Sequence, residues 1–254
     1  AQIEKAGGKV IKGDLSQIET LKGVTKGMHT VISAVSNMDE KVRYDGQVAL
    51  IQDCLENNVS RFVPTDFAGD FTKFTPEEIS RSMVAETKVN LKKYLEKIPI
   101  KTLHFWPGFF METWFEAQQH GFSYWDHEDQ RYDLTSYEDT GKVVASAVSN
   151  PEKTGDIYFV GDDLSIKEIN EIYNKVRGTN VQQKRLGSLD DLKKKWEELK
   201  KGDNHFMTHA LGLFSMMYDD RSKFHSNNNA DFPDVKFTSF EEFLKQNPEF
   251  KVPE

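Results

Sequence analysis

The 254-residue sequence lacks several features that mark common classes of protein. It has a single cysteine, Cys54, which excludes an internal disulfide and is typical of a reducing compartment. No apolar run approaches the roughly 20 residues that span a bilayer, and the N-terminal residues lack the apolar stretch of a signal peptide. We therefore expect a cytoplasmic protein that could also reach the nucleus and does not bind a membrane.

Familiar catalytic and metal-binding motifs are also missing. The sequence has no Walker A loop, no nucleophile elbow and no zinc spacing of cysteines and histidines. No tyrosine is followed four positions later by a lysine, which is the catalytic pair of ordinary short-chain dehydrogenases. His205 and His209 stand one helical turn apart, but Phe206 occupies the position where a metalloprotease needs glutamate. We expect no metal site.

The charge balance excludes another class. Lysine and arginine number 33 and aspartate and glutamate 41, so the formal net charge is -8. A net acidic chain is unfavourable for direct nucleic-acid binding. Hydrophobic residues make up 37% of the chain, with 18 phenylalanines, which is enough to build a core.

Short apolar runs alternate with helix signals through residue 106, which predicts an α/β fold with a doubly wound parallel sheet. Capping boxes, in which Ser or Thr is followed three positions later by Glu, indicate helix starts at Ser16, Thr75, Ser165 and Thr238. A further helix is expected at 137–149. The expected strands are 9–11, 30–35, 61–63, 102–106 and 156–160. We expect a sheet domain over 1–150 and a mainly helical lobe over 151–254, with the strand near 157 returning to the sheet.

Lys88 is the first candidate for a functional residue. It shares a helical stripe with the apolar residues Val84, Leu91 and Leu95, so it faces the core side of its helix or the rim of a cleft. One interpretation is structural, with a packed stem and an ammonium in water. The other is an ammonium at a pocket rim that binds ribose or phosphate oxygens, or acts as an acid towards a developing oxyanion.

Three strand ends carry further candidates. The segments 33–36 and 63–67 place small and hydroxyl residues where doubly wound sheets bind ligands. At 106–112, Pro107 ends a strand, and Gly108 allows a flat ligand to approach the backbone. The aromatic residues there could line a nicotinamide or an aromatic substrate, or could be a core turn with packed rings.

Several segments together resemble the NmrA-like and isoflavone-reductase-like branch of the atypical short-chain dehydrogenases. The most specific match is 59–67, VSRFVPTDF, preceded by Gln47, Leu50 and Ile51. The turn PGFFME at 107–112 is similar to the family's PGFFMEN, and Lys88 stands where the family has a lysine-bearing helix. The segments 10–16, 31–35, 139–141 and 160–165 are similar to other family segments.

The resemblance implies a partial Rossmann-type domain over 1–150 that binds NADP(H), favoured over NAD(H), and a smaller C-terminal lobe over 151–254 for substrate or partner. It implies that Lys88 polarises or protonates the substrate. The residues expected at the cofactor are Asp14 near the adenine, and Ser33, Ala34, Val35, Pro64, Thr65, Lys88, Pro107, Gly108 and Phe109. Those expected at the substrate are Phe110 and Trp114.

One departure from the family is large. The Gly-rich loop GxxGxxG occurs nowhere in the 254 residues, and no basic residue follows a second strand to select the 2′-phosphate. In the strand order 3-2-1-4-5-6, the missing strands would lie between 9–11 and 30–35. We expect 9–11 to lack a sheet neighbour and one edge of 30–35 to be exposed, unless a rearranged segment or a partner chain covers it. The chain is expected to be a fragment, an unusual gene model or one half of something larger.

Two functions follow from these observations. The first is a reductase that transfers hydride from NAD(P)H to a small aromatic, carbonyl or quinone compound. The second is a redox sensor of the NADP(H) pool that binds a protein partner such as a transcription factor. An exposed-looking stripe supports the second, unless it is ordinary core, and consists of Phe206, Leu213, Phe214, Met216 and Met217. A homodimer is a further expectation.

Overall fold

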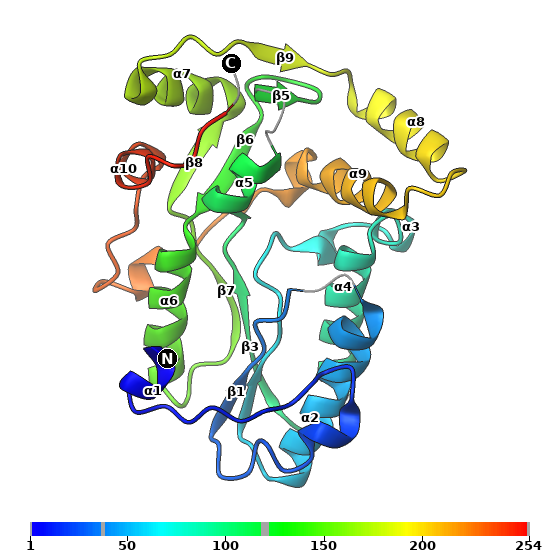
Figure 1. Ribbon diagram of the computed structural model, residues 1–254, viewed down its shortest axis with the longest axis vertical. Helices are drawn as coiled ribbons and strands as arrows, with labels where there is room; N and C mark the ends of the chain where they lie inside the picture. Colours follow the sequence, from blue (N-terminus) through cyan, green and yellow to red (C-terminus); the bar gives the residue numbers. More distant parts are fainter. Residues whose placement is uncertain (1, 37–38, 118–121, 253–254) are drawn as a thin grey trace. The chain divides into compact units, whose positions relative to one another are not determined.

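A computed structural model describes residues 2–36, 39–117 and 122–252 (Figure 1). The chain forms two compact units, each considered by itself below. The first unit consists of Ala1–Thr65 and Asn90–Leu103, and the second of Asp66–Val89 and His104–Glu254. The two units reflect contacts within the chain and do not test the expected domain boundary near residue 150. That boundary stays a prediction. In the described part of the chain, no helix is long and apolar enough to cross a membrane.

The first unit contains parallel strands and one long helix. The strand β1 pairs in parallel with β2, and β2 with the start of β3, as predicted for a parallel sheet. The elements are α1 (Gln2–Lys5), the 3-10 helix η1 (Ile18–Leu21), β1 (Thr30–Ile32), the π-helix η2 (Lys41–Asp45), α2 (Gly46–Glu56) and β2 (Arg61–Val63), with parts of α4 (Met83–Leu95) and β3 (Lys101–Trp106). The core of this unit includes Ile51, Cys54, Phe62 and Leu91. Burial raises the pKa of the Cys54 thiol to about 12, so the thiol is inert at neutral pH.

Two predictions in the first unit are wrong. Residues 9–11 form no strand, because β1 ends the sheet and no described strand lies beside it. Val10 and Ile11 are accordingly 60% and 54% exposed. Ser16 caps no helix, because only the short η1 follows and its N-cap is Gln17, without a side-chain hydrogen bond. The hydroxyl of Ser16 instead donates to Asp14 Oδ1 at 2.7 Å.

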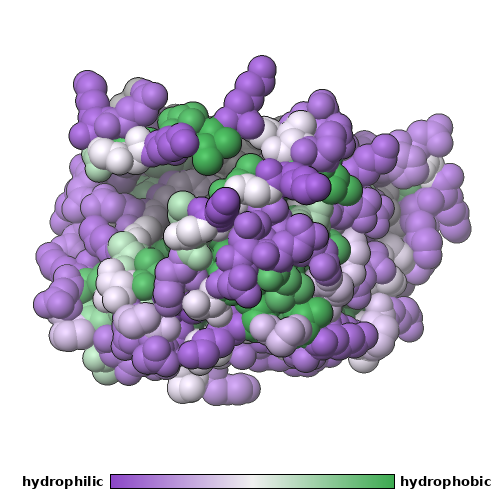
Figure 2. Space-filling model, turned by 90° about the horizontal axis from the view of Figure 1, so that it is seen from below, coloured by the Kyte–Doolittle hydropathy of each residue, from purple (hydrophilic) through white to green (hydrophobic). Residues whose placement is uncertain are grey.

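Large apolar side chains reach the surface of the first unit. They are Ile3, Val10, Ile11, Ile18, Met28 and Ile32. Ile32 belongs to β1, whose outer edge is unpaired among the described residues, which agrees with the expected exposure of 30–35. The face of the molecule shown in Figure 2 is mostly hydrophilic, with separate hydrophobic areas between the charged side chains.

The second unit contains the remaining strands and most of the helices. The end of β3 continues into this unit and lies beside β7, so the strand near 157 returns to the sheet as expected. A second sheet has the order β4-β6-β8, and a third pairs β5 with β9. The strands are β4 (Phe109–Phe110), β5 (Phe122–Tyr124), β6 (Arg131–Thr135), β7 (Gly155–Tyr158), β8 (Asp162–Ser165) and β9 (Gln183–Arg185).

The helices of the second unit include α7 and α10, which lie side by side (Figure 1). They pack on an aromatic core with Phe115, Phe240 and Tyr173. The helices are η3 (Phe71–Lys73), α3 (Pro76–Ile79), α5 (Met111–Ala117), α6 (Tyr137–Ser149), α7 (Ile166–Arg177), α8 (Leu189–Leu199), α9 (His205–Met217), η4 (Asp220–Ser222), η5 (Asn229–Asp231) and α10 (Phe240–Gln246), together with the start of α4.

Most helix signals in the second unit are confirmed. Thr75 and Ser165 form complete capping boxes, and α6 spans the expected 137–149. The box expected at Thr238 is formed one residue later by Ser239 and Glu242. The stripe proposed for a protein partner is mainly packed: Met216 is buried and Leu213, Phe214 and Met217 pack against core clusters, whereas Phe206 is 65% exposed.

Gly108 forms the turn between β3 and β4. Its φ of +72° lies in the left-handed region, which favours glycine. A Cβ atom there would overlap the backbone oxygen of Asp133 in β6. The turn therefore depends on glycine for both its conformation and its contact with the neighbouring strand.

Replacing Gly108 should destabilise the protein more than replacing a glycine that only has a positive φ. Gly178, at φ +67°, ends α7 with nothing near a Cβ atom, so Gly178→Ala should cost only about 1 kcal/mol. Gly108→Ala adds the overlap with Asp133 and should lower the free energy of unfolding clearly further. Urea denaturation of both variants measures this, and equal losses would show that the turn relaxes without cost.

An ion pair joins α3 to the segment after α9. Arg221 Nη2 lies 2.8 Å from Glu78 Oε1, and Arg221 Nη1 lies 3.2 Å from Glu78 Oε2. The guanidinium of Arg221 also lies over the ring of Phe74. Hydrogen bonding to Arg221 lowers the pKa of Glu78 to about 2.

This pKa predicts how stability depends on pH. Because the folded-state pKa of Glu78 is below its unfolded value of about 4.3, the ion pair stabilises the fold above that pH and loses its effect as the pH falls towards 2. Glu78→Gln keeps the cap but removes the charge, so its destabilisation should be present near neutral pH and vanish in acid. Urea denaturation over a pH series measures the difference, and a difference independent of pH would contradict the assignment.

Candidate functional site

The ends of β1 and β2 are joined by hydrogen bonds within the first unit. Ser33 N donates to Val63 O at 2.8 Å, and Thr65 Oγ1 donates to Val35 O at 2.8 Å. Ser33, Pro64 and Thr65 are buried, Val35 is half-buried and Ala34 is exposed. The hydroxyl oxygen of Ser33 is buried with no hydrogen-bond partner in the described part of the chain, which leaves one polar group for a ligand.

Asp14 is exposed and belongs to a local turn. Its carboxylate accepts hydrogen bonds from the hydroxyl and the backbone N–H of Ser16, which lower the pKa of Asp14. Its expected place near an adenine stays a prediction, as do the cofactor contacts of the other residues of the first unit.

In the second unit, a buried acid–base pair lies at the loop that follows β2. Asp66 Oδ2 is 2.6 Å from His104 Nδ1 in β3, and both side chains are almost completely buried, at 1% and 5% exposure. The next residue, Phe67, has a φ of 29°, a strained value for a bulky side chain. Its ring stacks on Phe105 at 6.0 Å between centroids. Two adjacent residues of β3, His104 and Phe105, thus contact two adjacent residues of the loop, Asp66 and Phe67.

Lys88 is linked to this loop. It lies in α4, is half-buried, and its ammonium donates a hydrogen bond to the backbone oxygen of Asp66. The neighbouring residues Ala85 and Val89 pack with Phe71 in an apolar cluster. The lysine therefore has a packed helix face and an ammonium bound to the loop backbone, and its place at a pocket rim stays a prediction.

The turn after β3 is fixed on both sides. Thr135 Oγ1 donates to Pro107 O at 2.8 Å, and Phe109 packs edge-on to Tyr132 at 5.5 Å between centroids. Pro107 and Gly108 are buried, and Phe109 is half-buried. Of the predicted cofactor residues, the second unit thus contains Lys88 and this turn.

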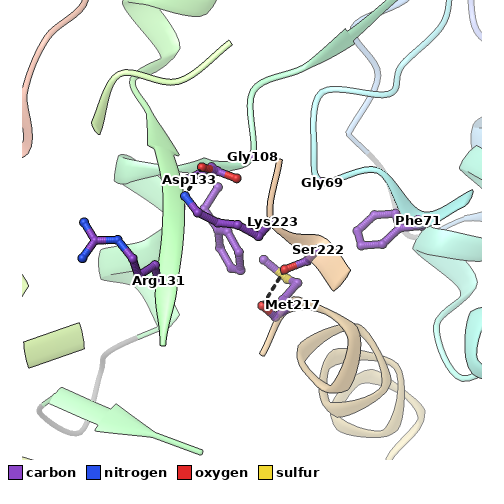
Figure 3. A pocket seen from close by; sticks show the side chains of 9 residues that line it. Gly69, Phe71, Gly108, Arg131, Asp133, Met217, Ser222 and Lys223 are labelled. Carbon is purple, nitrogen blue, oxygen red and sulfur yellow. Dashed lines mark hydrogen bonds and ion pairs between the residues drawn. The ribbon is translucent and has the colours of Figure 1, made fainter. Parts of the chain in front are cut away.

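The turn borders a narrow pocket (Figure 3) that in this conformation barely admits a water molecule. The pocket is lined by Gly69, Phe71, Gly108, Phe109, Arg131, Asp133, Met217, Ser222 and Lys223. Lys223 extends to the carboxylate of Asp133, while the guanidinium of Arg131 points away from the pocket (Figure 3).

An ion-pair network surrounds Asp133. Its carboxylate pairs with Lys223 and accepts the backbone N–H of Phe224 at 2.8 Å. Lys223 also lies 2.6 Å from Asp163, which in turn pairs with Arg131 at 3.0 Å. These contacts hold the segment after α9 over the pocket.

The two predicted substrate residues differ in their surroundings. Phe110 is half-buried and its ring centroid lies 4.4 Å from that of Tyr137, which is exposed. Trp114 is buried among Phe115, Phe122 and Phe240. The packing of Trp114 favours the alternative of a structural role, and its contact with a substrate stays a prediction.

Several residues at this site were not predicted from the sequence. Asp66 stood within the quoted VPTDF segment, but no spacing rule links it to His104, which lies 38 residues away. Asp133 and Lys223 are 90 residues apart, so only the folded chain brings them together. Among the described residues, no cluster could hold a metal ion.

The described residues fit only part of a nicotinamide dinucleotide. Within the second unit, the ammonium of Lys88 and the side-chain-free surface of Gly108 suit the nicotinamide and ribose end. A diphosphate is normally bound by a Gly-rich turn that opens a helix, and the sequence contains no such motif. In the part of the chain that the structure describes, the usual diphosphate-binding motif is therefore absent.

Comparison with known proteins gives the family and the fold. No curated protein matches the chain by sequence. An isoflavone reductase structure superposes with a TM-score of 0.79 at 19% identity, over 96% of this chain and 83% of the other. The structure of AtPrR2 with NADP+ and (+)pinoresinol gives 0.79 at 17%, over 96% and 83%. A ternary complex of leucoanthocyanidin reductase from Vitis vinifera gives 0.76 at 16%, over 96% and 87%.

These similarities show a Rossmann-like fold of the isoflavone reductase type, in agreement with the predicted fold class. The sequence profile of the NmrA-like family matches residues 1–244, nearly the whole chain. The protein belongs to the NmrA-like family.

Proposed function

We propose that the protein is an NADPH-dependent reductase of a small aromatic compound that bears a carbonyl or quinone group. The observation that carries the proposal is the anchored ammonium of Lys88, held by the loop after β2 and linked through Asp66 to β3. The turn that follows β3 contains Gly108 and Phe109, which border a pocket. The similar structures include one solved with NADP+, which supports the choice of NADP(H).

In this reaction the protein positions the substrate and stabilises the charge that develops in the transition state. When bound, the reduced nicotinamide supplies a hydride. Lys88 would hydrogen-bond the carbonyl oxygen of the substrate and stabilise the negative charge that develops as the hydride reaches the carbon. Transfer of a proton from Nζ to that oxygen gives the alcohol, and solvent returns the proton to the amine.

The pocket must widen before this reaction can take place. An aromatic ring needs far more space than one water, so the segment 217–224 must move before a substrate can enter. The ion pair of Lys223 with Asp133 holds this segment in place. The apolar part of the pocket lining consists of Phe71, Phe109 and Met217, and it suits an aromatic compound once the segment has moved.

A redox-sensing regulatory protein is the second candidate. The closed pocket and the missing diphosphate motif favour it, because both reduce the ability to turn over a substrate. Phe206 and Met207 of α9 are exposed apolar residues that a partner could contact. Binding of NADPH without consumption of any aromatic carbonyl compound would favour this candidate over the reductase.

Lys88→Met should lower the rate of NADPH oxidation about 10²- to 10⁴-fold, because the variant keeps the helix and the length of the side chain but removes the acid. Lys93→Met changes an exposed lysine of the same helix and is the matched control. NADPH absorbance with quinones and aromatic enones measures both variants. Equal rates in Lys88→Met and the control would refute the catalytic role.

The cofactor fit predicts an unusual pattern of affinity. Because Lys88 and Gly108 suit the nicotinamide end and the sequence contains no Gly-rich turn for the diphosphate, reduced nicotinamide mononucleotide should bind to this chain about as tightly as NADPH, within roughly tenfold, or about 1.4 kcal/mol. Titration calorimetry with both compounds measures the two dissociation constants. Binding of NADPH that is a hundredfold tighter or more, about 2.7 kcal/mol, would show that the chain binds the diphosphate by residues other than the usual motif.

A further inference from the structure

We propose that His104 is a positioning residue that holds the ammonium of Lys88 in place through Asp66. The importance of this arrangement for catalysis rests on the proposed reductase function, but the arrangement itself can be tested without any turnover.

The side chain of Asp66 is buried and fixed by His104. A carboxylate removed from water must be paired, and breaking such a pair is costly. Asp66 Oδ2 lies 2.6 Å from His104 Nδ1, whereas Oδ1 is buried with no hydrogen-bond partner among the described residues. A carboxylate only accepts hydrogen bonds, so the imidazole donates. His104 is therefore the group that fixes the Asp66 side chain.

The fixed side chain of Asp66 also constrains the position of the Asp66 backbone. The backbone oxygen of the same residue accepts the hydrogen bond of the Lys88 ammonium. Phe67, which follows, keeps a strained φ of 29°, and its ring stacks on Phe105, the neighbour of His104. A strained backbone persists only where its surroundings hold it. The contacts of β3 thus set the direction of the carbonyl that binds Lys88.

The ring of His104 is itself held by packing within β3. His104 stacks on Trp106 with 6.1 Å between ring centroids and 7° between the planes. Its Nδ1 contacts Asp66, whose backbone oxygen binds Lys88, so these contacts connect His104 to Lys88 through the loop.

Two substitutions of His104 separate hydrogen bonding from packing. The amide of His104→Asn can donate from the position of Nδ1 but loses the ring stack on Trp106. His104→Phe keeps a ring of similar size on Trp106 but has no donor. If positioning depends on the hydrogen bond, the asparagine variant behaves as the wild type and the phenylalanine variant does not.

The readout is the rate at which acetic anhydride acetylates Lys88 in the folded protein, followed by mass spectrometry. Acetylation requires a free, exposed amine, and a hydrogen bond to a carbonyl protects the ammonium. The loss of one such bond corresponds to about a two- to tenfold change in the rate. We expect this increase in His104→Phe and a rate near the wild type in His104→Asn, with exposed Lys93 unchanged in both.

Two results would overturn the proposal. One is a Lys88 rate in folded His104→Phe that equals the wild-type rate. The other is an equal increase in both variants, which would show that packing alone holds the lysine. If a thermal melt shows that His104→Phe does not fold, Asp66→Asn takes its place, since it keeps the size of the side chain but accepts a weaker bond. A faster Lys88 rate is then expected, and an unchanged rate contradicts the proposal.

The acetylation rate needs neither cofactor nor substrate, so its outcome is independent of whether the protein is a reductase. Where turnover is found, His104→Phe should lower kcat more than it changes KM. The kcat of His104→Asn should stay near the wild-type value. A purely structural role would not produce this rescue by the donor-bearing variant.

Discussion

The candidate site depends on one buried charge, the carboxylate of Asp66. In an interior of low dielectric constant such a group must be paired, and the structure pairs it with His104 of β3. The same residue gives its backbone oxygen to Lys88 of α4. One residue therefore joins the loop after β2 to a strand and to a helix, and the strained Phe67 beside it persists because Phe105 supports its ring.

A second buried carboxylate determines the form of the pocket. Asp133 binds Lys223 and the backbone N–H of Phe224, and its backbone oxygen lies where a side chain at Gly108 would be. The turn after β3 and the segment after α9 thus meet at one residue of β6. The segment after α9 lines the narrow pocket and is held there by this partly buried ion pair.

Local patterns in the sequence predicted the parallel strands, α6 and the capping boxes at Thr75 and Ser165, because strand periodicity and helix caps depend on neighbours within a few residues. The strand at 9–11 failed because a strand needs a partner, which its own residues do not reveal. Ser16 failed as a cap because only the short η1 follows it, and the N-cap of η1 is Gln17. Lys88 could be found from its helical stripe, whereas Asp66–His104 and Asp133–Lys223 join distant residues and arise only from the fold.

The central claim is that Lys88 and the turn after β3 form a reductive site. The most direct measurement uses NADPH carrying deuterium at both C4 positions of the nicotinamide, together with aromatic aldehydes and enones, and detects the label on carbon in the product by mass spectrometry. The account predicts one deuterium in the product, in a single configuration, for at least one compound of this class. Binding of NADPH with no transfer of deuterium to any of them would contradict it and favour a regulatory protein.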